Sequence, residues 1–139
     1  MKRLFDWITS DHHILHKNIS KFTGRPYPHD ETGALEMSLD MIRRHNSVVS
    51  PDDEVWFLGD LAMGDFTEAL GLASTMNGRK FMVPGNHDRN HPYFWNRKFK
   101  TNPEGALKKL NEHRRLYEDA GFELLPLDFR IELSGKDCT

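Results

Sequence analysis

Side chains able to bind metal ions follow three apolar stretches of the chain. Asp11 and His13 come after the first stretch (FDWIT), Asp60 after the second (VWFL), and Asn86 and His87 after the third (FMV). Carboxylate oxygens, imidazole nitrogens and amide oxygens are common ligands of divalent metals. Carboxylates gathered in a partly buried place repel one another unless a cation lies between them. The pattern therefore predicts a metal site.

Each of these residues suits a particular part in metal-assisted hydrolysis. Asp60 can bridge two ions, which a shared carboxylate holds about 3.5–4 Å apart. Asp11 and His13 are two positions apart on a segment expected to be extended, so both side chains point to one side and reach one ion. Asn86 can offer its carbonyl oxygen to a second ion. His87 would then lie beside the site as a general acid for the leaving group of a phosphate ester.

Alternating strands and helices are expected to position this chemistry. Apolar runs predict strands ending at Thr9, over 55–60 and over 79–83. Strand, helix and strand in quick succession indicate a βαβ unit and a parallel sheet with right-handed crossovers. Ligands of such sheets gather at the carboxyl ends of the strands, where all three motifs fall.

Helices are expected over 31–49, 66–76 and 103–120, with Asp30, Asp65 and Asn102 as their N-caps. Helical spacing predicts two buried faces; the first comprises Leu35, Leu39, Ile42 and Val49, and the second Leu107, Leu110, Arg114 and Tyr117. The aromatic and basic stretch 92–103 is expected to be an irregular loop beside the site.

The C-terminal stretch 127–133 has the clearest alternation of apolar and charged residues in the chain, which predicts a half-buried strand. A hairpin turn is expected over 134–137, with too few residues after it for a returning strand. Such a strand would leave an unpaired edge. We therefore expect one domain over 1–139 that is the N-terminal portion of a larger one, or a chain that self-associates through this strand.

The composition limits the class of protein. The length of 139 residues suits a single domain, and 37% hydrophobic with 29% charged residues is typical of globular chains. The net charge of −2 does not indicate a nucleic-acid partner, and no apolar run is long enough to cross a membrane. Cys138 is the one cysteine, which excludes a disulfide framework and favours the cytoplasm.

Together, the three motifs resemble those of the calcineurin-like metallophosphoesterases, most closely the small bacterial and phage members. The family's D-x-H, G-D and G-N-H-[DE] motifs stand here in order as DHH at 11–13, GD at 59–60 and GNHD at 85–88. The resemblance covers residues 4–90. It implies an α/β fold whose complete form is a sandwich of two β-sheets flanked by helices, and hydrolysis of phosphodiesters or phosphomonoesters, nucleotides among them.

The resemblance also implies roles for the site residues. Asp11 and His13 would bind the first metal, Asp60 would bridge, Asn86 would bind the second metal and the phosphate, and His87 would assist departure of the leaving group. A hydroxide activated by the two ions would attack phosphorus in line. Mn, Fe, Zn and Ni suit these ligands, with Mn favoured.

Further histidine ligands that the family supplies from a lone His and a GHxH motif do not occur in this sequence. The alternative to an enzyme is therefore a catalytically inactive fragment that binds metal or a partner.

Two other residues are candidates for substrate contacts. Arg25 could grip a phosphate bidentately, and His16 lies near enough in sequence to face the substrate. A solvated surface role for Arg25 and a loop role for His16 remain alternatives. The triplet at 11–13 also spells the DHH signature of a different phosphoesterase family, but that interpretation leaves the motifs at 59–60 and 85–88 unexplained.

Overall fold

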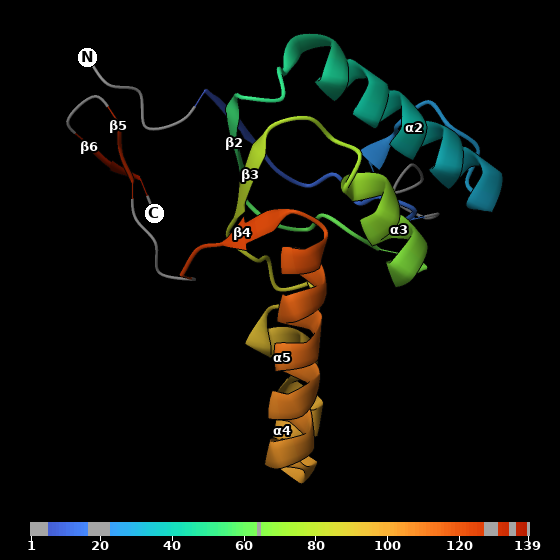
Figure 1. Ribbon diagram of the computed structural model, residues 1–139. Coiled ribbons are helices and arrows are strands. Elements are labelled where there is room, and N and C mark those ends of the chain that lie inside the picture. The colour runs from blue at the N-terminus through green and yellow to red at the C-terminus, as the bar shows by residue number, and fades with distance from the viewer. Residues whose placement is uncertain (1–5, 17–22, 64, 127–130, 134–135, 139) are drawn as a thin grey trace.

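A parallel β-sheet carries the three motifs. The computed structural model describes residues 6–16, 23–63, 65–126, 131–133 and 136–138 (Figure 1). Its main sheet has four parallel strands in the order β1 (Trp7–Thr9), β2 (Glu54–Phe57), β3 (Arg79–Met82) and β4 (Phe122–Leu124). The predicted α/β fold and parallel sheet are confirmed. β4 is not expected from the sequence, because three residues show too little alternation to be told from the turn before them.

The hydrophobic core lies between this sheet and the helices. From the sheet, Val55, Phe57, Met82 and Phe122 are buried. Ala69, Leu70 and Ala73 of α3 (Phe66–Ala73) and Tyr117 of α5 (Pro103–Asp119) pack in the same cluster. Ile14 and Leu61, from the loops that follow β1 and β2, are fully buried there. The core therefore anchors both loops that carry the predicted ligands.

The predicted caps of the first two helices are confirmed. Asp30 accepts a hydrogen bond from Gly33 N at 2.8 Å at the start of α2 (Glu31–Val48). Asp65 accepts from Glu68 N at 3.0 Å at the start of α3. The end predicted for α3 at Met76 is wrong, because the helix stops at Ala73. The hydroxyls of Ser74 and Thr75 donate to carbonyls of the last turn at 2.6 Å, and such bonds compete with helix continuation.

The buried face predicted for α2 is half wrong. Leu35 and Leu39 are 36% and 48% exposed, whereas Ile42 is buried as expected. The buried face of α2 instead includes Ala34, Met37 and Ser38. Ser38 accounts for which face of α2 is buried, because its hydroxyl donates to Ala34 O at 2.7 Å and accepts from Leu15 N at 2.9 Å. The hydrogen bond from Leu15 N connects α2 to the loop after β1.

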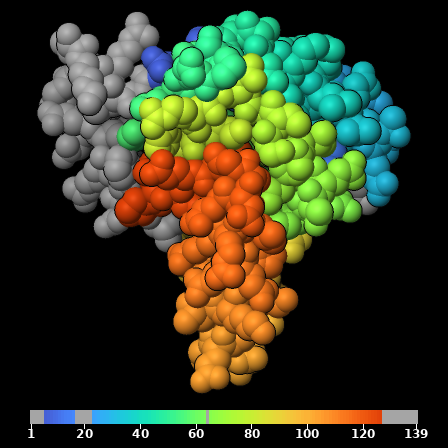
Figure 2. Space-filling model, in the orientation of Figure 1, coloured from blue at the N-terminus to red at the C-terminus, as the bar shows by residue number. Residues whose placement is uncertain are grey.

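The stretch expected as an irregular loop is helical, so that prediction is wrong. It forms a 3-10 helix, η1 (Pro92–Trp95), and then α4 (Asn96–Thr101), which packs against α5. The side chain of His91 caps η1 by accepting from Tyr93 N at 2.9 Å, and proline suits the first helical position. The predicted N-cap of α5 is confirmed, since Asn102 accepts from Gly105 N at 3.0 Å. Figures 1 and 2 show α4 and α5 projecting from the body of the molecule.

The second predicted face is also partly wrong, because Leu107 on α5 is 51% exposed while Leu110 and Tyr117 are buried. Ala106 takes the buried place instead.

A short hairpin follows near the C-terminus, and the prediction that the returning strand is absent is wrong. β5 (Ile131–Leu133) pairs antiparallel with β6 (Lys136–Cys138), with Leu133 opposite Lys136. β6 thus begins inside the turn predicted over 134–137, which leaves enough residues for pairing. Residues 127–130 of the predicted strand lie outside the described residues, and self-association through 127–133 stays a prediction. No helix in the described ranges is long and apolar enough to cross a membrane.

Candidate metal centre

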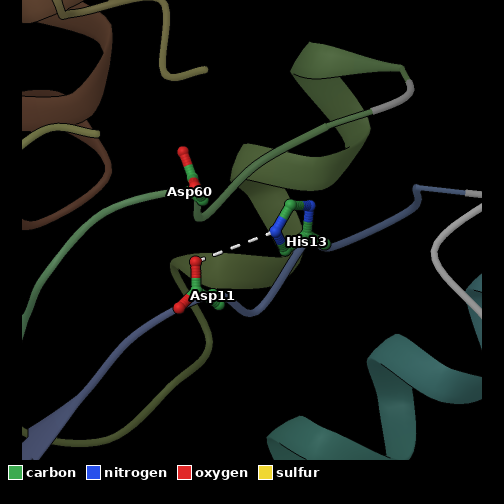
Figure 3. A group of neighbouring side chains, drawn as sticks. All are labelled: Asp11, His13 and Asp60. Atoms are coloured by element: carbon green, nitrogen blue, oxygen red, sulfur yellow. Dashed lines mark ion pairs between the residues drawn. The ribbon is translucent and has the colours of Figure 1, made fainter. Parts of the chain in front are cut away.

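Three predicted ligands meet beyond the carboxyl ends of β1 and β2. One ligand atom from each of Asp11, His13 and Asp60 lies within 4.8 Å of the others (Figure 3). The Nε2 atom of His13 is 3.9 Å from Oδ1 of Asp11. Within the described parts of the chain, this is the one such cluster of His, Cys, Asp and Glu side chains. The convergence predicted from the strand ends is therefore present for these residues.

Backbone hydrogen bonds join the two loops that carry the cluster. Asp11 N donates to Gly59 O at 3.0 Å, His13 N to Asp60 O at 3.0 Å, and Ile14 N to Leu61 O at 2.8 Å. The loops therefore run side by side beyond the sheet. Their spacing is set by the backbone, which is more rigid than contacts between side chains would be.

All three cluster residues have a left-handed backbone. The φ angles are +57° for Asp11, +50° for His13 and +52° for Asp60. Residues other than glycine rarely adopt this conformation, which costs about 1–2 kcal/mol each, and such strain concentrates at functional sites. The expectation that Asp11 and His13 share a side because their segment is extended is wrong. Their side chains converge because the backbone turns at both residues.

Two glycines let the third motif pack directly against the second. A Cβ atom on Gly85 would lie 2.6 Å from Oδ1 of Asp60, and one on Gly59 would lie 2.7 Å from Gly85 N. His87 N approaches Oδ1 of Asp60 at 3.4 Å, while the side chains of Asn86 and His87 are exposed. The GNHD turn thus borders the cluster. The roles of Asn86 and His87 stay predictions.

The last residue of the GNHD motif holds the site together, a role that the sequence reasoning missed. Asp88 is fully buried. Its Oδ2 atom accepts from Asp60 N and Gly85 N, each at 2.7 Å, and Oδ1 accepts from Leu61 N at 2.9 Å. Burial raises the pKa of Asp88, although the three backbone donors oppose the shift. The sequence held one signal of this role, namely that an acidic residue directly follows GNH.

The histidines of the first loop have different environments. Burial lowers the pKa of His13, and the charge of Asp60 opposes this, so the ring is neutral at pH 7 and able to bind a metal. His16 stacks on His13 with ring centroids 5.4 Å apart. His12 instead is buried against Phe57, with ring centroids 5.3 Å apart. His12 therefore belongs to the core, as expected of a residue that is not a ligand.

Comparison with known proteins identifies the family. A family model of calcineurin-like phosphoesterases matches residues 7–136. The chain belongs to this family. Calcineurin-like phosphoesterases are metal-dependent, which agrees with the cluster of Asp11, His13 and Asp60. The resemblance seen in the three sequence motifs is confirmed.

Similar sequences occur in mycobacteriophages and in an archaeon. The Gene 66 protein of Mycobacterium phage L5 is 38% identical over 89 residues, which are 62% of this chain and 41% of the phage protein. The uncharacterized protein MJ1445 of Methanocaldococcus jannaschii is 36% identical over 85 residues, 60% of this chain and 46% of that protein. The chain spans less than half of the length of these curated relatives.

One solved structure supports the fold alone. The protein of unknown function AQ665 from Aquifex aeolicus superposes with a TM-score of 0.53 at 23% sequence identity. The match covers 95% of this chain and 58% of that protein. The described residues therefore have an arrangement found in an experimental structure.

The cluster fits a divalent metal ion. Two carboxylates and one imidazole are hard and borderline donors that suit Mn, Fe, Zn or Ni. Ligand atoms bound to one ion at about 2.1 Å lie about 3–4 Å apart, close to the 3.9 Å between His13 and Asp11. The Nδ1 atom of His13 is buried without a hydrogen-bond partner. The nitrogen that faces Asp11, and would bind a metal, is instead Nε2.

Arg25 contacts the backbone of the first ligand loop. Its guanidinium donates to Asp11 O at 3.0 Å and to His12 O at 3.2 Å. It also approaches Sδ of Met37 on α2 at 3.2 Å. Neither Arg25 nor His16 is tested as a substrate contact by these observations, and both roles stay predictions.

The burial of His12 predicts a loss of stability in mild acid. Burial lowers the pKa of His12 from 6.5 to about 4, with smaller contributions from His45 and Arg25. The unfolded chain thus binds a proton between pH 6.5 and 4 that the folded chain excludes. Stability is expected to fall by roughly 3 kcal/mol from this residue as pH decreases through that window. Urea unfolding at pH 7 and pH 4, in chelator, measures it.

The variant His12→Gln has no titrating group at this position. Between pH 7 and pH 4 its free energy of unfolding should therefore fall by roughly 3 kcal/mol less than that of the wild type. His29→Gln, at an exposed position, is the matched control and should follow the wild type. Equal pH dependence of His12→Gln and the wild type would contradict the assignment.

Proposed function

We propose that this chain hydrolyses phosphate esters, diesters or monoesters, with divalent metal ions bound at Asp11, His13 and Asp60. The observation that carries the proposal is the convergence of these three donors, each on a left-handed backbone, in a member of the calcineurin-like phosphoesterase family. Backbone strain of this kind is retained where it serves function. Because a fold alone does not assign a reaction, the proposal rests on the residues of this site.

Each residue in and around the cluster has its own role in the proposed reaction. Asp11, His13 and Asp60 would hold a first ion, and Asp60 with the carbonyl oxygen of Asn86 would hold a second. When bound, the ions polarise the phosphate and lower the pKa of water. His87, exposed at the border of the site, donates a proton to the leaving group. His16, stacked on His13, faces the phosphate ester.

A second candidate function is metal binding without turnover. It is favoured by the size of the cluster, which has three donors in the described residues. Two ions normally need more ligands than three side chains provide. Metal stoichiometry separates the candidates, since two tightly bound ions per chain favour the enzyme.

Metal removal tests the proposed reaction. We expect the purified chain to hydrolyse bis-p-nitrophenyl phosphate in Mn²⁺, with release of nitrophenol followed by absorbance. EDTA should abolish hydrolysis, and excess Mn²⁺ should restore it, because the ions polarise the phosphate and activate the attacking water. Turnover that persists in EDTA would sink the proposal. Tight Mn²⁺ binding without turnover would instead select the second candidate.

A further inference from the structure

We propose that Arg25 is a positioning residue of the metal centre, which acts by holding the backbone carbonyls of the loop that carries Asp11 and His13. The inference rests on the proposed function only in taking these two residues as metal ligands. It differs from the predicted role of Arg25 as a group that grips the phosphate of the substrate.

Arg25 contacts the backbone of the ligand loop and the side chain of a residue on α2. Nη2 donates to Asp11 O at 3.0 Å, and Nη1 donates to His12 O at 3.2 Å. Nη1 also lies 3.2 Å from Sδ of Met37, on the buried face of α2. The guanidinium is thereby seated between helix and loop, and two of its nitrogens engage peptide groups between the two ligands.

The conformation of the loop explains why such a group is needed. Asp11 and His13 are both left-handed, at φ +57° and +50°, with His12 between them. This turn directs the carbonyls of Asp11 and His12 toward the single guanidinium, where a planar fork of donors satisfies both. A lysine is a point charge on a flexible stem and cannot reproduce the fork. Arg25 therefore favours the strained conformation that aims both ligands.

If Arg25 served only to bind substrate, its guanidinium N–H groups would have no protein partner before phosphate binds. Here Nη1 and Nη2 are already engaged by uncharged carbonyls in the ligand loop. If Nη1 and Nη2 turned toward a phosphate, the carbonyls of Asp11 and His12 would lose these two hydrogen bonds. The positioning role and the substrate role therefore predict different effects on metal affinity.

Isothermal titration of the full chain with Mn²⁺ tests the proposal. We expect Arg25→Ala to weaken binding about 10- to 100-fold, as found for residues that orient metal ligands in other proteins. Arg25→Lys should bind nearly as weakly, because it keeps the charge and loses the fork. The matched control is Arg79→Ala, which removes a surface arginine whose ion pair with Glu54 lies at the start of β2 and β3, and should bind within 2-fold of the wild type.

Substrate kinetics at saturating Mn²⁺ give a second readout. A positioning role predicts that KM for bis-p-nitrophenyl phosphate changes less than 2-fold in Arg25→Lys, while the Mn²⁺ concentration needed for half-maximal rate rises. Unchanged Mn²⁺ affinity in Arg25→Ala, or a rise in KM at saturating metal, would overturn the proposal. Circular dichroism checks the fold of each variant, and if Arg25→Ala is unfolded, Arg25→Lys and Arg25→Gln decide by the same criteria.

The outcome is separable from that of the proposed function. A wild-type chain that binds Mn²⁺ without turnover, with weaker binding in the Arg25 variants, supports the positioning role and rejects the enzyme. A wild-type chain that turns over substrate, with equal Mn²⁺ affinity in all variants, supports the enzyme and rejects the positioning role. Absence of Mn²⁺ binding in the wild type would overturn both.

Discussion

Asp60→Asn is expected to lower Mn²⁺-dependent hydrolysis of bis-p-nitrophenyl phosphate by more than about 100-fold. Asp60 is the residue proposed to contact both ions, and loss even of a partner that only orients a ligand costs about 10- to 100-fold. Asparagine removes the charge but keeps the size of the side chain. It also tolerates the left-handed backbone at φ +52°, so the loop should keep its shape. The reduced rate would therefore report the lost carboxylate.

The kinetic experiment has a matched control. Asp52→Asn makes the same chemical change in the exposed turn before β2, at the opposite end of the strand from Asp60. Its rate and Mn²⁺ affinity should equal those of the wild type. If Asp60→Asn retained more than about a tenth of the wild-type rate at limiting Mn²⁺, Asp60 would not be the bridging ligand.

Asp88→Ala is expected to destabilise the chain by about 3–5 kcal/mol. Asp88 accepts hydrogen bonds from Asp60 N, Leu61 N and Gly85 N inside the protein. Its removal leaves these buried donors unpaired, each at a cost of about 1–3 kcal/mol before relaxation. Because natural domains are stable by about 5–15 kcal/mol, the variant should lie near the limit of folding. Urea unfolding followed by circular dichroism measures the change.

Asp65→Ala is the reference variant against which the loss of stability in Asp88→Ala is compared. Asp65 accepts one backbone hydrogen bond at the exposed N-cap of α3, and the loss of such a cap costs about 1 kcal/mol. If Asp88→Ala cost no more than Asp65→Ala, the buried carboxylate would not hold the two motifs together. Asp88→Asn should fall between them, because its amide oxygen still accepts while its NH₂ group faces a donor.

Local patterns in the sequence were enough to predict the centre of the sheet and the identity of the ligands. The apolar runs before Asp60 and Asn86 identified β2 and β3, because β-branched and aromatic residues favour a buried strand. Asp30, Asp65 and Asn102 marked helix starts correctly, since a cap depends on residues within one turn. The order of the three motifs was sufficient to indicate the family.

Features that depend on distant neighbours were not predictable in the same way. Leu35 and Leu39 have the right spacing for a buried face, but Ser38 faces inward because Leu15 N, distant in sequence, needs an acceptor. The helices η1 and α4 form in a stretch whose prolines and charges suggested a loop, since His91 caps the first and α5 packs on the second. Tertiary contacts, and not local propensity, therefore decide which face of α2 is buried and where η1 and α4 form.

The sequence by itself therefore determined which groups could bind a metal, because ligand chemistry belongs to residue type. Only the tertiary structure decided how they are held. It put Asp11, His13 and Asp60 on left-handed backbone, buried Asp88 beneath the second and third motifs, and turned Arg25 toward the carbonyls of the first. The physical reason is that strain and buried charge persist only where contacts from distant segments compensate for them.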